Sequence, residues 1–253
     1  MSVLTLNGFV IHRRPYRETS LLVDFFTLES GRITAVVKGV RSNSKSSRKS
    51  LLQPLQRIQF DCIGRTNLKN LTRVEAFGPA LNCRGNALYA SFYLNEVLQR
   101  ALPESEPVEH LFEMYQHTLE QLTLLTPVAT AESENMLQPD KVSQPKSKNT
   151  ALEPLLREFE LTLLMTLGYL PDLSCDSETL APVIENAHYQ YFPEKGLVSC
   201  ANTAKHAISG EVLHKISNSQ FSRETLAPAK YICRSTLPLA IGNKPIKSRE
   251  LFV

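Results

Sequence analysis

A cluster of basic residues is the feature of this 253-residue sequence whose chemistry is easiest to interpret. Five cations fall within twelve positions that contain no acidic residue: Lys38, Arg41, Lys45, Arg48 and Lys49. Serine and asparagine side chains stand between them, at positions 42–44 and 46–47. Cations neutralise phosphates and hydroxyls donate hydrogen bonds to phosphate oxygens, so this composition is typical of a surface that binds nucleic acid. The alternative interpretation is a solvated loop without a ligand.

Further cations lie on both sides of this cluster. We include as candidate nucleic-acid contacts five arginines of the same N-terminal segment: Arg13, Arg14, Arg17, Arg57 and Arg65. Aromatic residues that could stack on bases are scarce here, and only Tyr16 and Phe26 remain as candidates. We therefore expect contacts to the sugar–phosphate backbone, tolerance of any base sequence, and binding to both single and double strands.

A second set of cations lies near the C-terminus, in the segment GNKPIKSRELF, residues 242–252. Lys244, Lys247 and Arg249 surround a proline there, and Arg157 is a lone cation among glutamates in an apolar, helical segment. Cations beside an apolar surface suit a partner's acidic peptide that ends in an aromatic residue, because a carboxylate meets Arg or Lys while a ring enters a pocket. The alternative is a solvated basic tail.

Signatures of metal binding and of catalysis are weak or absent. Cys175 and Cys200 have the spacing of the first members of two zinc-knuckle pairs, but Glu178 and Thr203 stand where the second members would be. A structural zinc site needs four nitrogen or sulfur ligands, so we expect no metal and no cofactor. The sequence also lacks a phosphate-binding P-loop, a dinucleotide-binding motif and the common hydrolase motifs, which disfavours an enzyme.

Composition bounds the class of protein. With 42% apolar and 21% charged residues, the chain has the composition of a globular protein of one or two domains. No apolar run is long enough to span a membrane, and the first twenty residues lack the pattern of a secretion leader. Five cysteines without a C-x-x-C pair argue against a disulfide framework. We expect a cytoplasmic protein, associated with the nucleoid if it binds DNA.

Charge is distributed unevenly along the chain. Residues 1–75 contain 13 Lys and Arg against 5 Asp and Glu, a net charge of +8. Residues 76–200 have a net charge of −10 and residues 201–253 of +5, by the same count. This asymmetry favours two domains over one and places the attraction for polyanions in the first of them.

The basic residues fall within a segment that has the periodicity of strands. Apolar and polar residues alternate in 20–26, 31–39 and 57–64, and further strands are expected near 8–13 and 68–77. Five short strands suit a small closed barrel of the OB type, with an open five-stranded sheet as the alternative. In either arrangement the basic stretch 41–50 connects the third and fourth strands.

After residue 84 the period changes to that of helices. We expect an α+β protein with an OB-fold nucleic-acid-binding domain over residues 1–80 and a mainly helical domain over 81–253. Within the latter, 172–203 is a degenerate zinc-knuckle-like region and 126–150 a flexible loop. Apolar stripes with helical spacing cover residues 94–102, 108–122 and 152–167, with weaker stripes near 209–217 and 225–240.

Several strings together resemble the RecO family of bacterial DNA repair proteins. They are GFVIHRRPYRETSLLVDFFTLESGRI (8–33), VVKGVRS (36–42), LLQPL (51–55), LYASFYLNEVLQRAL (88–102), LREFELTLLMTLGY (156–169) and KPIKSRELF (244–252). They follow one another in the order of the family across nearly the whole chain. Many members of the family hold zinc with paired cysteines in the region of 175–203, whereas this chain retains only two of them.

The resemblance implies a fold and a role. The fold is an N-terminal OB-fold followed by a helical domain, and the role is that of a non-enzymatic recombination mediator. Such proteins anneal complementary strands, dock on the acidic, Phe-ended tail of single-strand-binding protein and, with RecR and RecF, help RecA onto DNA. The matching positions here are Arg13, Arg14, Arg17, Lys38 and Arg41 in the barrel and Arg157, Lys247 and Arg249 in the helical domain.

Two other classes of function stay open at this point. A positively charged barrel can bind RNA as well as DNA. An RNA-binding OB module with a helical adaptor domain is therefore the alternative function. A metal-dependent nuclease is disfavoured by the missing site. If the chain is a mediator, its partners are single- and double-stranded DNA, RecR and the tail of single-strand-binding protein, with RecF and RecA engaged indirectly and no membrane involved.

Overall fold

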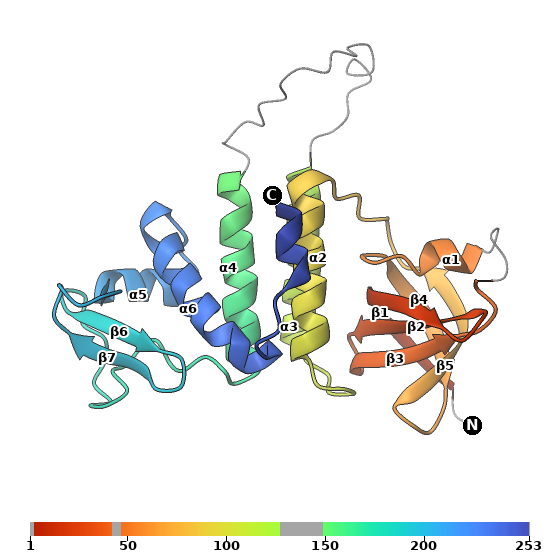
Figure 1. Cartoon of the computed structure of the whole chain (residues 1–253), viewed down its shortest axis with the longest axis horizontal. Helices are drawn as coiled ribbons and strands as arrows, with labels where there is room; N and C mark the ends of the chain where they lie inside the picture. The colour runs from red at the N-terminus through yellow and green to blue at the C-terminus, as the bar shows by residue number, and fades with distance from the viewer. Residues whose placement is uncertain (1–2, 42–46, 127–148, 253) are drawn as a thin grey trace, which may run out of the picture.

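The computed structural model describes residues 3–41, 47–126 and 149–252. Its N-terminal part is a closed barrel in which the strands follow one another in the order β1-β2-β3-β5-β4 (Figure 1). Neighbouring strands are antiparallel except β3 and β5, which run parallel. The closed barrel, rather than an open sheet, is therefore the correct alternative. The strands are β1 (Val3–Tyr16), β2 (Ser20–Thr27), β3 (Gly31–Val37), β4 (Arg57–Ile63) and β5 (Leu68–Ala76).

Alternation of side chains explains why these segments form the barrel. Ile33 and Ala35 of β3, and Ile58 and Phe60 of β4, fill the interior, while the residues between them are partly exposed. The strand β2 departs from this pattern because it is buried at every position. Its inner face fills the barrel, and toward its end its outer face contacts the helices through Asp24 and Phe26.

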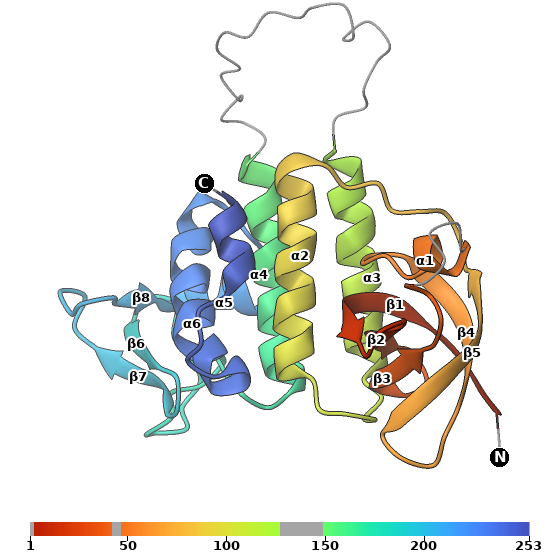
Figure 2. The ribbon, with the colours of Figure 1, turned by 45° about the vertical axis from the view of Figure 1, so that its right-hand side comes forward.

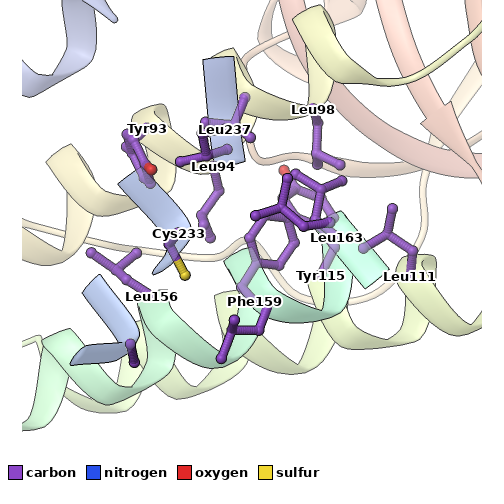
Figure 3. Packing of buried hydrophobic residues seen from close by; sticks show 14 of the residues in the cluster. Tyr93, Leu94, Leu98, Leu111, Tyr115, Leu156, Phe159, Leu163, Cys233 and Leu237 are labelled. Carbon is purple, nitrogen blue, oxygen red and sulfur yellow. The ribbon is translucent and has the colours of Figure 1, made fainter. Parts of the chain in front are cut away.

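The C-terminal part is mainly helical, with a small sheet at its far side (Figure 1). The helix α4 packs against α2, α3 and α6. Figure 3 shows the ring of Phe159 on α4 beside that of Tyr115 on α3, with their centroids 6.2 Å apart. The helices are α2 (Gly85–Ala101), α3 (Glu109–Leu124), α4 (Asn149–Thr166), α5 (Gly210–Ser217) and α6 (Arg223–Ile241), with a C-terminal 3-10 helix (Lys247–Phe252). The small sheet consists of β6 (His188–Phe192), β7 (Gly196–Cys200) and β8 (Ile208–Ser209).

The barrel is docked tightly on the helices. Figure 2 shows α3 beside β1 and β2 of the barrel. Phe26 of β2 is fully buried against Phe112 and Tyr115 of α3, with ring centroids 5.3 and 5.9 Å away. Beside this contact, the Arg32 Nε donates a hydrogen bond of 2.8 Å to the Leu102 carbonyl oxygen. The expectation that Phe26 could stack on bases is therefore wrong, because its ring belongs to the core between barrel and helices.

The expected α+β architecture, a five-stranded N-terminal barrel followed by a helical region, is confirmed. The boundary between 80 and 81 stays a prediction, since apolar residues of the barrel and of the helices share one continuous core. The expected loop 126–150 falls almost entirely on residues 127–148, which lie outside the described residues. Within the described ranges, no helix combines the length and the apolar character needed to cross a membrane.

Candidate functional site

Cations gather at the end of the barrel where β1 turns into β2 and where β3 ends. Arg17 occupies this turn with a φ of 52°, in the left-handed region, and is exposed. Arg41 anchors the turn twice, because its Nη1 donates to the Arg17 carbonyl oxygen at 2.9 Å and its N–H to that of Thr19 at 3.0 Å. Lys38, one residue after β3, is exposed beside the same turn and lines a cavity together with Arg17.

The short helix α1 (Ser47–Leu51) brings two more cations to this end. The Arg48 Nη2 donates to the Thr72 carbonyl oxygen at 2.7 Å, and Lys49 is exposed beside it. Because β5 runs parallel to β3 with Asn70 opposite Val36, Thr72 lies next to the end of β3, where Lys38 follows. We call this surface the basic end of the barrel and define it by Arg17, Lys38, Arg41, Arg48 and Lys49.

The remaining candidates of the barrel lie in several places. Arg13 and Arg14 are on β1 near the basic end, paired with Val23 and Leu22. The structure does not bring Arg57 to this end, since its guanidinium lies over the Phe77 ring, 4.8 Å from the centroid, on the side facing the helices. It does not bring Arg65 there either: this residue is on the β4–β5 connection. Lys45 lies outside the described residues.

A second candidate site lies between the end of α6 and the C-terminal 3-10 helix. Apolar side chains and cations surround a pocket of about 210 Å³ there. We call it the C-terminal pocket. Its lining includes Leu237, Pro238, Ile241, Ile246, Arg234, Lys244 and Arg249. Lys247, which the sequence grouped with them, is exposed outside this lining. An apolar depression with exposed guanidinium and ammonium groups around it suits a carboxylate-bearing peptide with one large apolar side chain.

Two residues of α2 hold the pocket in shape. Arg100 donates to the carbonyl oxygens of the 241–245 segment, including that of Ile241 at 2.9 Å and of Lys244 at 2.7 Å. Glu96 accepts hydrogen bonds of 2.8 Å from the N–H and the hydroxyl of Ser248. Partial burial alone would raise the pKa of Glu96, but these bonds and the neighbouring Arg100 lower it below its ordinary value. The carboxylate is therefore ionised at neutral pH and fixes the C-terminal segment on α2.

The structure corrects the expectation for Arg157, which is buried rather than exposed among the other cations. The Arg157 Nη2 donates to the fully buried Glu160 Oε1 at 3.0 Å, and the Tyr93 hydroxyl donates to the same oxygen. Arg249 in turn donates to the Tyr93 hydroxyl at 3.3 Å and lies over its ring. Because α4 packs on several helices at once, more than one of its faces is buried. Arg157 is linked to Arg249 of the C-terminal pocket through Glu160 and Tyr93.

Sequence reasoning missed Arg234, an exposed residue of α6 that lines the C-terminal pocket. A signal for it was present, because Arg234, Leu237, Pro238 and Ile241 have the spacing i, i+3, i+4 and i+7 that places side chains on one face of a helix. Sequence reasoning also missed Arg100 and Glu96. Their role depends on a contact with a segment more than 140 positions away, which no local pattern indicates.

The region 172–203 does not provide a zinc site among the residues that the structure describes. Cys175 and Cys200 are free thiols, and no three His, Cys, Asp or Glu side chains of the described ranges gather to hold a metal. Asp176 accepts hydrogen bonds from the Ser199 N–H at 2.8 Å and from the Thr179 N–H at 2.9 Å. The Ser199 hydroxyl donates to the same carboxylate at 2.6 Å, and this bond, together with the two N–H bonds, lowers the pKa of Asp176 and ties the segment to β7.

Comparisons with known proteins give matches along the chain. A family model described as the N terminal part of recombination protein O matches residues 1–80, and one described as its C terminal part matches residues 84–132. The chain is 43% identical over 253 residues to the DNA repair protein RecO of Pseudoalteromonas atlantica. The aligned residues make up 100% of the chain and 95% of that relative. It is 38% identical over 250 residues to RecO of Alteromonas mediterranea, with 98% and 96% covered, and 38% identical over 246 residues to RecO of Haemophilus influenzae, with 97% and 94% covered.

Proposed function

Because the chain belongs to the RecO family of DNA repair proteins, which are non-enzymatic recombination mediators, we propose that its two sites have separate tasks. The basic end of the barrel binds the sugar–phosphate backbone of single- and double-stranded DNA. The C-terminal pocket binds the acidic, Phe-ended tail of single-strand-binding protein. The protein anneals complementary strands and, with RecR and RecF, helps load RecA onto DNA coated with single-strand-binding protein.

The observation that supports DNA binding best is the convergence of cations from separate segments on the basic end. Arg17 comes from the β1–β2 turn, Lys38 and Arg41 from the segment after β3, and Arg48 from α1. None of them forms a side-chain ion pair with an acid in the described part of the chain, so their charges are free to meet phosphates. Contacts to phosphates leave base edges accessible, and neutralised strands repel one another less, which is what annealing requires.

The proposal for the tail of single-strand-binding protein relies on the C-terminal pocket. Arg234, Lys244 and Arg249 provide positive charge for the acidic residues, while Leu237 and Ile246 provide apolar surface for a phenylalanine ring. Arg100 and Glu96 hold the segment around the pocket before any ligand binds. A preformed site loses less conformational entropy on binding, which favours a short peptide.

Annealing of two complementary strands coated with single-strand-binding protein tests the DNA-binding half of the proposal. We expect the triple variant Arg17→Glu, Lys38→Glu, Arg41→Glu to lose most of the annealing rate, and a matched triple reversal of the exposed Arg84, Lys205 and Arg223 to retain it. Equal rates for the two variants would contradict the assignment. A single-stranded RNA competitor shows whether the site distinguishes DNA from RNA.

Titration with a peptide that copies the Phe-ended tail tests the other half. We expect Arg249→Glu and Arg234→Glu each to weaken binding, because each removes a cation from the lining of the pocket. Lys205→Glu, which lies outside the lining of the pocket, serves as the control. An absence of binding by the unmodified protein would remove this task and leave the DNA-binding proposal intact.

A further inference from the structure

The helices α2 and α3 contact the outer face of the barrel near the end of β2. Leu21, Val23 and Phe25 fill the barrel interior, so the residues that alternate with them on β2 point outward. Of these, Phe26 is buried under α3 and Asp24 accepts a hydrogen bond of 2.9 Å from Gln99 of α2. Strands 2 and 3 and the loop after strand 1 are where OB-type barrels bind oligonucleotides. Here the helices occupy one part of that face.

The other part of the face, at the basic end, contains an open cavity of about 410 Å³. It lies at the start of β2 and the end of β3. Tyr16 and Ser20, which face each other across β1 and β2, form one side of it, and Val36 forms the floor. Its lining consists of Tyr16, Arg17, Glu18, Thr19, Ser20, Val36 and Lys38.

The side chains around this cavity provide the groups that recognise a nucleotide. Tyr16 is half-buried and carries an aromatic ring, and the guanidinium of Arg17 lies 5.3 Å from the centroid of that ring. Lys38 adds an ammonium group, and Thr19 and Ser20 add hydroxyls. Glu18 is the one acid in the lining, and the two cations exceed its charge. Ring stacking on bases and cations on phosphates are the two contacts by which proteins bind single strands.

We propose that this cavity is a subsite for one unpaired nucleotide of single-stranded DNA, with Tyr16 stacking on the base and Arg17 and Lys38 binding the adjacent phosphate. The inference rests on the proposed DNA-binding function and adds to it a contact with a base. The cavity of about 410 Å³ limits the site to one nucleotide, and Asp24 and Phe26 farther along β2 are already engaged by the helices. A base inside a duplex is already stacked and paired, so duplex DNA binds the basic end without using Tyr16.

Affinities of the full-length protein for an oligo-dT single strand and for a duplex of equal length test the subsite. Tyr16→Leu is expected to weaken single-strand binding about tenfold, within the range known for loss of one base–aromatic contact, and to leave duplex binding within about twofold. Tyr16→Phe retains the ring and is expected to bind both DNAs as the unmodified protein does. Tyr169→Leu, an exposed tyrosine of the helical region, is the control.

A single strand with one 2-aminopurine base gives an independent readout, since stacking on an aromatic ring quenches its fluorescence. We expect quenching with the unmodified protein and with Tyr16→Phe, and its loss with Tyr16→Leu. Unchanged single-strand affinity in Tyr16→Leu, or an equal loss for single strand and duplex, would overturn the subsite while leaving salt-dependent DNA binding in place. Failure of the unmodified protein to bind either DNA would overturn the proposed function and the subsite together.

Discussion

Gly31 and Glu106 meet backbone to backbone where the barrel is docked on the helices. A Cβ atom on Gly31 would lie 1.8 Å from the Glu106 carbonyl oxygen, and Gly31 has a φ of 63°, which side chains other than that of glycine rarely allow. Nearby, the Ser105 N–H donates to the Arg32 carbonyl oxygen at 2.9 Å. The orientation of the basic end relative to the helices therefore depends on a contact that only glycine permits.

Replacing Gly31 with alanine is expected to destabilise this docking. Gly39 provides a matched control, since it has a φ of 71° but nothing lies within 4 Å of its added Cβ. Both substitutions introduce backbone strain of about 1 kcal/mol, and Gly31→Ala adds a clash of about 1–3 kcal/mol. Urea unfolding measures the difference in the free energy of unfolding. Equal destabilisation by the two variants would show that the Glu106 backbone shifts to accommodate the added Cβ atom without loss of stability.

Arg100 is expected to act on peptide binding without contacting the peptide. Its hydrogen bonds hold the carbonyl oxygens of the 241–245 segment, so Arg100→Gln releases the wall of the C-terminal pocket. We expect the affinity for the Phe-ended peptide to fall about tenfold and DNA affinity to stay unchanged, as measured by fluorescence anisotropy. Arg84→Gln, an exposed arginine that precedes the same helix, is the control. Peptide affinity that is equal in the two variants would exclude a positioning role.

Arg157 and Glu160 are expected to contribute to stability rather than to recognition. Both are buried, and the Arg157 Nη1 and Glu160 Oε2 have no hydrogen-bond partner among the described residues. Arg157→Ala leaves Glu160 as an uncompensated buried charge, so we expect the free energy of unfolding to fall by about 3–5 kcal/mol. The double variant Arg157→Met, Glu160→Leu should recover most of this loss. A double variant as unstable as the single one would mean that packing, and not charge, is responsible.

Much of the fold could be predicted from sequence because it depends on local periodicity. The alternation in 31–39 and 57–64 corresponds to strands β3 and β4, and the apolar stripe in 152–167 to α4. These patterns arise because apolar side chains are buried on one face of a strand or helix, and the type of each residue in the sequence shows whether it is apolar.

What could not be predicted depends on contacts between segments distant in sequence. Phe26 lies in an alternating strand, and only the docking of α3 shows that its outward position is buried. Arg157 has charged neighbours in sequence, and only the packing of α4 against several helices shows that it is enclosed. The sequence likewise grouped Arg57 and Arg65 with Arg17, because all three are cations of the N-terminal segment. The order of the strands places Arg57 and Arg65 elsewhere on the barrel.

Acid is expected to weaken the contact between the barrel and α2. Burial alone would raise the pKa of Asp24, but the nearby His12 and hydrogen bonds from Thr34 and Gln99 lower it below its ordinary value. A lowered pKa in the folded state stabilises the fold above the pKa of the unfolded state, about 4, and this contribution is lost as the pH falls through the folded value.

Urea unfolding at pH 7 and at pH 3 measures this effect. Asp24→Asn is expected to be less stable than the unmodified protein at pH 7, with the difference shrinking as the pH falls below about 4. Glu113→Gln, an exposed acid on α3, is the control for a general loss of negative charge. A difference between Asp24→Asn and the unmodified protein that is constant with pH would contradict the assignment.

The salt dependence of single-stranded DNA binding tests most directly whether the basic end contacts phosphates. Each phosphate contact to a single strand contributes about −0.7 to the slope of log affinity against log salt concentration. The triple variant Arg17→Gln, Lys38→Gln, Arg41→Gln should therefore have a slope about 2 less steep than that of the unmodified protein. The matched triple variant of Arg84, Lys205 and Arg223 should retain the original slope. A slope that stays the same when the three cations of the basic end are removed would contradict the account.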